Sequence, residues 1–195
     1  TLHLRARQQP SFDEDLSGTL VSASAPVAVL GGHSCANVPF SQAACDYLVE
    51  HLPATNHLGQ EFFVAPFATR TGYRVRVVAA SAGTQVLEDG ALVATLAAGE
   101  LYERDVDTVD TALHLQTSQP ALVAQYAYGT SVDSQPGDPS MMLVTPVRQF
   151  DRDVFLNTVP SEVREFDDWA SIVIDAGEVG GLRLDGAPLT TTFTP

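Results

Sequence analysis

The residues with the clearest chemical potential lie in the run VAVLGGHSCA, at positions 27–36. An apolar, β-branched stretch leads into two glycines and then into His33, Ser34 and Cys35. In α/β-hydrolases the nucleophilic serine follows a strand in this way, on a sharp turn that exposes its hydroxyl above a parallel sheet. Ser34 is therefore a candidate nucleophile, and the rest of the chain must supply its partners.

The elements expected around Ser34 argue against that chemistry. A hydrolase sheet needs parallel strands joined by crossovers of about a dozen or more residues, whereas the connections here are a few residues long. The triad also needs an acid and then a histidine after Ser34, and the last histidine, His114, lies inside the alternating run TALHLQT. We therefore expect that Ser34 is not catalytic.

A second candidate is a calcium site in the loop SVDSQPGDPS, residues 131–140. Asp133 and Asp138, together with backbone carbonyls and water, offer the hard oxygen ligands that calcium prefers. The loop lacks the dense aspartate pattern of a calcium-binding hand, so an ordinary polar turn is the alternative. Calcium is the one cofactor that the sequence suggests.

Three further side chains are candidates for contacting a ligand. His33 could serve as a metal ligand or a base, although a histidine next to a glycine pair more often holds a loop by a hydrogen bond. Tyr126 and Tyr128 lie in the run ALVAQYAYG and could form a platform on which a sugar stacks. Aromatic residues in strands are, however, more often part of the core.

The two cysteines, Cys35 and Cys45, lie ten positions apart. This spacing is too wide for a CxxC redox pair, and two thiols are too few for a structural zinc site without histidines. The residues alone leave two alternatives, which are a disulfide that closes a short loop and a pair of buried thiols.

Composition excludes several classes of function. The chain has 24 acidic residues against 10 basic ones, all of them arginine, and a formal net charge of −14. Nucleic acids and anionic membranes require a basic face, so neither is expected as a partner. No stretch approaches the ~18 apolar residues of a membrane span. The absence of lysine also excludes Schiff-base chemistry and a P-loop.

The expected elements are mostly strands. Short runs with period-two alternation, such as YRVRVV, alternate with turn signals such as Asp89-Gly90. They predict an all-β, antiparallel sandwich or jelly roll, with one short helix near residues 41–52, which Pro53 ends.

The domain organisation follows from the same pattern. We expect one β-domain over residues 19–188, preceded by a leader or linker at 1–18 and followed by the start of a linker at 189–195. A similar order of features in 19–130 and 131–188 also fits two related β-units packed together.

The run LGGHSCANVPFSQAACDYLVEHLP, residues 30–53, resembles the N-terminal domain family named after the IgG Fc-binding protein, which has homologues in bacterial surface proteins. Further motifs of the family follow in order, so the resemblance spans roughly residues 25–187. This chain departs from the family pattern at Tyr47, where histidine is frequent, and at Gln119, where lysine is usual. The matched positions in the first run are Gly32, His33, Cys35, Ala36, Val38, Pro39, Cys45, Asp46, Leu48, Leu52 and Pro53.

The resemblance implies an extracellular or cell-surface β-domain without enzymatic activity, in which Cys35 and Cys45 are bridged. Two functions remain open. The first is an adhesion or binding module of a larger surface or secreted protein, which recognises a protein or glycan. The alternative is a structural stalk domain with no ligand of its own. Neighbouring domains of a longer chain are expected partners in both cases.

Overall fold

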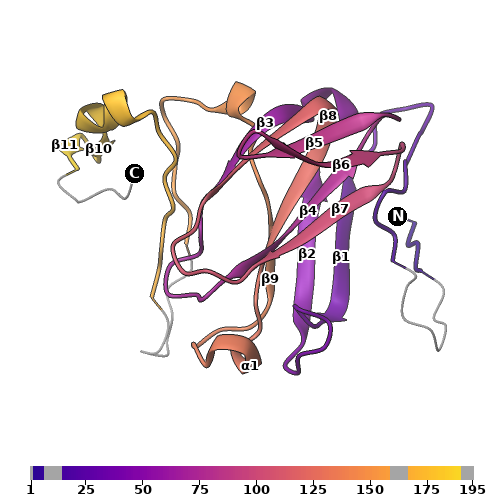
Figure 1. The fold of residues 1–195 in the computed structure, drawn as a ribbon, viewed down its shortest axis with the longest axis horizontal. Helices are drawn as coiled ribbons and strands as arrows, with labels where there is room; N and C mark the ends of the chain where they lie inside the picture. Colours follow the sequence, from indigo (N-terminus) through magenta and orange to yellow (C-terminus); the bar gives the residue numbers. More distant parts are fainter. Residues whose placement is uncertain (1, 7–14, 159–166, 190–195) are drawn as a thin grey trace.

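The computed structural model describes residues 2–6, 15–158 and 167–189. Strands dominate the described residues, and the helical elements are short (Figure 1). The elements are β1 (Val29–Ala36), β2 (Asp46–Leu52), η1 (Thr55–His57), β3 (Gly59–Val64), β4 (Tyr73–Ala79), β5 (Thr84–Glu88), β6 (Ala91–Leu96), β7 (Leu101–Val106), β8 (Leu113–Ala127), α1 (Thr130–Asp133), β9 (Ser140–Leu143), η2 (Val147–Gln149), η3 (Ala176–Gly181), β10 (Arg183–Leu184) and β11 (Ala187–Pro188).

One long strand organises the main sheet. The first part of β8 pairs with β3 and β5, and its second part pairs with β4 and β9, always antiparallel. Between the two parts lies Pro120, which cannot donate a backbone hydrogen bond. The two halves of β8 thus belong to two layers of one curled sheet. In this sheet β6 pairs with β5, and β7 pairs with β4. The predicted all-β, antiparallel class is confirmed.

The core lies between these layers. In β4, Tyr73, Val75, Val77 and Ala79 are buried, whereas the residues between them are partly exposed. This is the alternation that the YRVRVV run predicts, because successive side chains of a strand point to opposite faces. The other core residues include Phe62, Val64, Val86, Val106, Leu113, Leu115 and Val123.

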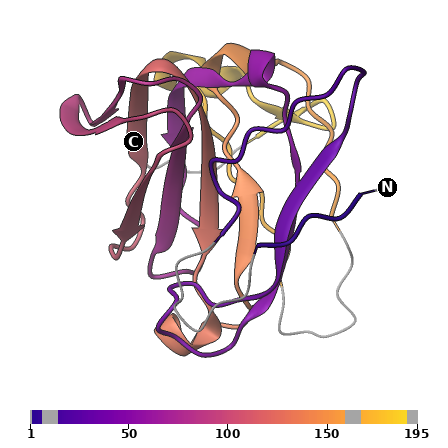
Figure 2. The same ribbon diagram turned by 90° about the vertical axis from the view of Figure 1, so that its right-hand side faces the viewer.

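The predicted helix at 41–52 is wrong. Residues 46–52 form β2, which pairs antiparallel with β1, and β2 packs beside β9 (Figure 2). The period-two pattern wins because Leu48 is buried while Tyr47 and Val49 point outward, and a β-strand with a paired neighbour satisfies its backbone groups as well as a helix would. The one α-helix of the described residues is α1, a four-residue turn at 130–133.

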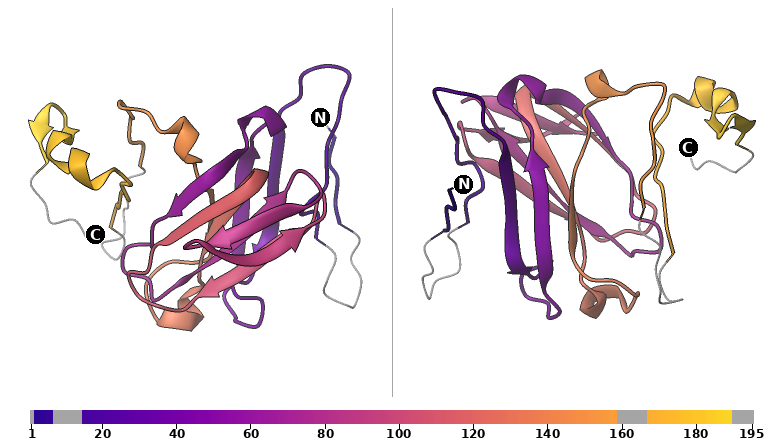
Figure 3. Two further views of the ribbon diagram at one scale, coloured as in Figure 1. Left: turned by 45° about the horizontal axis from the view of Figure 1, so that its top comes forward. Right: turned by 180° about the vertical axis from the view of Figure 1, so that it is seen from behind.

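The second of the two suggested β-units does not form in the described residues. From the second half of the chain, β9 joins the main sheet, and β10 and β11 have two residues each. The run SIVIDAG, residues 171–177, is rich in β-branched residues, yet it forms no strand and pairs with none of the described strands. The segment with β10 and β11 stands at the opposite side of the molecule from the N-terminal segment (Figure 3). The domain boundaries themselves stay predictions.

Candidate functional site

The disulfide implied by the resemblance is confirmed, since Cys35 and Cys45 are bonded and their Cα atoms are 4.9 Å apart. The bond ties the end of β1 to the residue before β2. Nδ1 of His33 accepts a hydrogen bond from the backbone N–H of Cys35 at 3.0 Å. His33 thus shapes the turn that carries the disulfide, which is the loop-holding role that the sequence favoured. Ser34 lies between these residues with an exposed side chain.

The disulfide loop, residues 37–45, rests against the segment that contains α1. The backbone N–H of Gly129 donates to the carbonyl oxygen of Val38 at 2.9 Å. The Ser131 hydroxyl donates to the carbonyl oxygen of Ala43 at 2.7 Å. In Figure 1, α1 and the connection between β1 and β2 lie together at the bottom of the view. Two regions almost ninety residues apart are thereby held in one surface, with a sequence separation of 88 across the Ser131 contact.

A buried ion pair fixes a third connection to the same segment. Nη1 of Arg70, in the loop between β3 and β4, lies 3.0 Å from Oδ1 of Asp133. The two side chains are 8% and 0% exposed. The Asp133 carboxylate also accepts from the backbone N–H groups of Thr71, at 3.4 Å, and Gln135, at 3.1 Å. The positive charge next to Asp133 is therefore a guanidinium of the chain itself.

Calcium binding by Asp133 and Asp138 stays a prediction. A calcium ion on Asp133 would have to share the carboxylate with Arg70, and Asp138 is exposed. In the part of the chain that the structure describes, no three His, Cys, Asp or Glu side chains gather in a way that could hold a metal. The sequence-based expectation is that millimolar calcium raises the melting temperature and that Asp138→Ala abolishes the rise. Coincident melting curves in calcium and in chelator would contradict it.

A fourth connection, between β7 and β8, is held through Tyr128. This side chain is buried, and its hydroxyl donates to Oδ1 of Asp107 at 2.7 Å. Burial, followed by the bond to Asp107, raises the pKa of Tyr128. Gly72 permits the close packing here, since a Cβ on it would lie 2.2 Å from the carbonyl oxygen of Val106. The buried Tyr128 side chain therefore holds the end of β8 against the β7–β8 connection.

These four connections define a surface that we call the loop end, made of residues 37–45, 65–72, 107–112 and 128–139. Each of the first three segments makes a side-chain hydrogen bond with the last one, residues 128–139. The loop end presents apolar side chains to solvent, with Phe40 and Val109 both 60% exposed and Val132 also exposed. Exposed acids, Asp107, Asp110 and Asp138, lie in the same segments. Loops on a rigid sheet are where binding residues concentrate.

Of the site residues that the sequence suggested, the loop end brings together the disulfide, Asp133, Asp138 and Tyr128. His33 lies next to it in β1. Sequence reasoning missed Arg70, whose partner is 63 residues away, and the apolar Phe40 and Val109. A large apolar residue inside a polar turn was the available signal for Val109, which lies within the acidic run ERDVDTVD.

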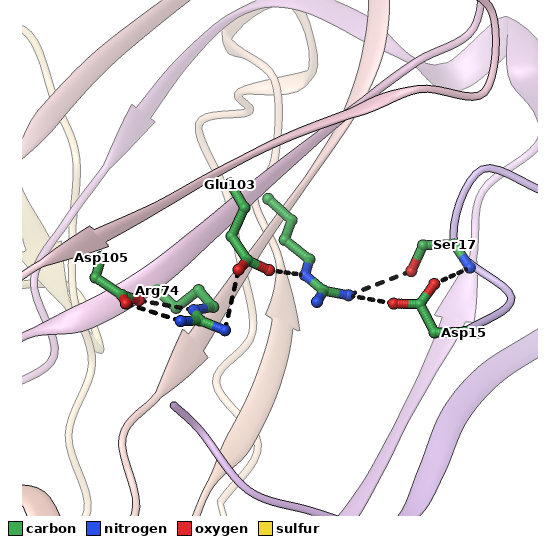
Figure 4. A network of polar contacts seen from close by, with 6 residues as sticks. Asp15, Ser17, Arg74, Glu103 and Asp105 are labelled. Carbon is green, nitrogen blue, oxygen red and sulfur yellow. Dashed lines mark hydrogen bonds and ion pairs between the residues drawn. The ribbon is translucent and has the colours of Figure 1, made fainter. Parts of the chain in front are cut away.

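Tyr126 lies elsewhere, on the outer face of the sheet formed by β4, β7 and β8. The Arg76 guanidinium sits 5.8 Å from the centre of its ring. Burial raises the pKa of Tyr126, against the opposing effect of Arg76. Around it runs a chain of ion pairs that links Arg74 and Arg76 to acids of β7 and of the N-terminal segment (Figure 4).

The two hollows found beside η1 and η2 are small. They measure about 160 and 190 Å³, and His51, Leu58, Gly59 and Gln149 line the first. Pockets for small organic ligands usually measure about 300–1,000 Å³. Both hollows are smaller than such a pocket.

We expect Ser34→Ala to leave the folded state and any binding largely unchanged, because the exposed hydroxyl lies in a disulfide turn, away from His114 in β8. The measurement is labelling by a fluorophosphonate probe, with thermal unfolding of the variant as the control for folding. Labelling of the wild type that disappears in Ser34→Ala would contradict this expectation.

The fold and the loop end define an antiparallel β-domain in which a disulfide and side-chain contacts connect the loops at one end of the sheet. Comparison with known proteins makes the assignment specific. The family model described as IgGFc binding protein matches residues 1–195, so the chain belongs to the IgGFc-binding protein family.

A human relative, the IgGFc-binding protein of Homo sapiens, is 30% identical over 183 residues. The match covers 92% of this chain and 3% of the relative, so the chain spans a small part of that protein. No solved structure matches the chain. Among the described residues, no helix is both long and apolar enough to cross a membrane.

Proposed function

We propose that the chain is an extracellular adhesion or binding module, and that it contacts a protein ligand through the loop end. One observation carries this proposal: four connections from distant parts of the sequence are held by a disulfide, a buried ion pair and two side-chain hydrogen bonds. Such pre-organisation reduces the loss of conformational freedom on binding. The disulfide supports an oxidising, extracellular location.

The nature of the ligand is part of the proposal. The name of the human relative states that it binds IgG Fc, and we take the Fc fragment as the probe for this chain. Exposed Phe40 and Val109 suit the apolar centre of a protein interface, where aromatic anchors are enriched. A glycan ligand would instead be expected to use small polar hollows and exposed aromatic faces.

Val109→Arg is expected to weaken binding of immobilised human IgG Fc at least about tenfold, since a charge in the centre of an apolar contact costs ~1.4 kcal/mol or more. The measurement is surface plasmon resonance. The matched control is Leu30→Arg, a similarly exposed apolar position on β1, which should bind like the wild type. A loss confined to Leu30→Arg would place the contact on the β1–β2 hairpin.

The stalk alternative makes a different prediction in the same experiment. A structural domain without a ligand would show no saturable Fc binding in the wild type or in either variant. A glycan array probed with the same proteins tests the glycan alternative, because a sugar-binding domain should bind glycans on the array without Fc.

A further inference from the structure

Arg76 differs from its neighbour Arg74 in how its charge is balanced. Nε and Nη2 of Arg74 lie 2.7 Å from the two carboxylate oxygens of Asp105, and its Nη1 lies 3.1 Å from Glu103. Both acids belong to β7, the strand that pairs with β4. The charge of Arg74 is thus balanced within the sheet by a two-pronged contact, the strongest geometry for an arginine and a carboxylate.

Within the sheet, Arg76 pairs with one acid, Glu103, and its guanidinium lies over the ring of Tyr126. Its Nε donates to Glu103, which it shares with Arg74. Its outer Nη1 donates to Oδ2 of Asp15 at 3.0 Å and to the Ser17 hydroxyl at 3.4 Å. Asp15 and Ser17 belong to the segment that precedes β1. The outer side of the Arg76 guanidinium is therefore paired with a segment that lies outside the sheet (Figure 4).

That piece, residues 15–18, is shaped to fit, and we call it the strap. The backbone N–H of Ser17 donates to Oδ1 of Asp15 at 2.7 Å, which folds the strap into a turn. Gly18 then lies directly against Gly99 in the turn between β6 and β7. A Cβ on Gly18 would come within 1.8 Å of the Gly99 carbonyl oxygen, so only glycine permits this approach.

We propose that Arg76, seated over Tyr126, is a binding site for an aspartate presented in an Asp-x-Ser turn of a partner protein, and that the strap occupies this site in the isolated domain. The strap shows what the site accepts, which is one carboxylate and one hydroxyl, two positions apart, on a guanidinium already oriented by Glu103. An acidic peptide is favoured over an acidic sugar because the resident occupant is itself a peptide turn.

The strap is held weakly enough to be exchanged. The side chains of Arg76 and Asp15 are 25% and 48% exposed, and exposed ion pairs contribute about 0–1 kcal/mol. Residues 15–28 contain no strand, so no backbone ladder joins the strap to the sheet. The site lies on a sheet face, not on the loop end, and it does not rest on the function proposed above.

Acid should release the strap. Burial raises the pKa of Asp15, but hydrogen bonds from Ser17 and the charge of Arg76 outweigh it and hold the pKa below its usual range. A lowered pKa means that the contact is complete above the unfolded value and is lost as the pH falls through the folded value. An NMR titration of the Asp15 carboxyl carbon is expected to give a midpoint below that of an ordinary aspartate, and Arg76→Gln should raise this midpoint. A midpoint at or above the ordinary value would contradict the contact.

The direct test adds the strap in trans as a peptide with residues 15–19, Ac-Asp-Leu-Ser-Gly-Thr-NH2, and follows the Nε–Hε signal of Arg76 by NMR. The expected result is a saturable shift that the Asn-Leu-Ser-Gly-Thr peptide does not produce. The apparent affinity should be about two- to sixfold higher in Asp15→Asn than in the wild type, because a resident strap held by about 0–1 kcal/mol competes with the added peptide. Gly18→Ala, which keeps Asp15 but spoils the fit against Gly99, should have the same effect.

Two results would overturn the proposal. One is an Arg76 signal that does not move with the aspartate peptide in Asp15→Asn, up to concentrations on the order of 10 mM. The other is equal affinity in the wild type and in both strap variants, which would show that the strap does not occupy the site. A shift produced by N-acetylneuraminate but not by the peptide would replace the peptide ligand with an acidic sugar. Unchanged unfolding curves confirm that the strap variants remain folded.

Discussion

Replacing Asp133 by alanine is expected to lower the free energy of unfolding by about 3–5 kcal/mol, because it leaves the Arg70 charge buried without its partner. Arg70 is 8% exposed, and its guanidinium lies 3.0 Å from the Asp133 carboxylate. Two backbone N–H groups lose their acceptor as well. Chemical denaturation of the wild type and the variant measures the difference.

Two controls make this result specific to the ion pair. Asp138→Ala removes an exposed acid from the same loop and should change the free energy of unfolding by no more than about 0.5 kcal/mol. The double variant Arg70→Met/Asp133→Leu should recover most of the loss, since an apolar pair of similar volume often matches a buried ion pair. A loss below about 1 kcal/mol in Asp133→Ala would contradict the buried pair.

Removing the disulfide is expected to have the next largest effect. In the double variant Cys35→Ser/Cys45→Ser, the free energy of unfolding should fall by about 2–3 kcal/mol, since the bond closes a short loop in the unfolded chain. The cysteines are separated by 10 positions. Urea denaturation is the measurement.

Reduction of the wild-type protein provides the matched control, because it breaks the same bond without changing a side chain. Wild type in reductant and the double variant in buffer should give the same midpoint. If the variant were as stable as the oxidised wild type, the disulfide would not hold the loop. Binding to Fc should weaken in parallel with stability, since the disulfide positions residues 37–45 against α1.

Local patterns in the sequence were sufficient to predict the sheet. Alternation in YRVRVV predicts a half-buried strand, and β4 has that burial pattern. Local β propensity fails for residues 171–177, which are rich in β-branched residues and form no strand, because a strand also needs a neighbour with which to pair. At 46–52 the helical interpretation failed for the converse reason: β1 supplies a neighbour.

The candidate site was only partly predictable because its key contacts are long-range. The loop of Asp133 was recognised as a place for a cation, but no local feature indicates that the cation is Arg70, 63 positions away. Tyr126 and Tyr128 looked equivalent in the sequence. Tyr128 follows the end of β8 and is buried under the β7–β8 connection, whereas Tyr126 lies on the outer face with Arg76.

The central claim is that the loop end is the surface that contacts a protein ligand. Hydrogen–deuterium exchange of the domain, alone and with saturating Fc fragment, tests it most directly. We expect slower exchange in residues 37–45, 107–112 and 128–139, with unchanged exchange in β1 and β6. Protection confined to the β1–β2 hairpin or to the outer face around Arg76, with no change at the loop end, would contradict it.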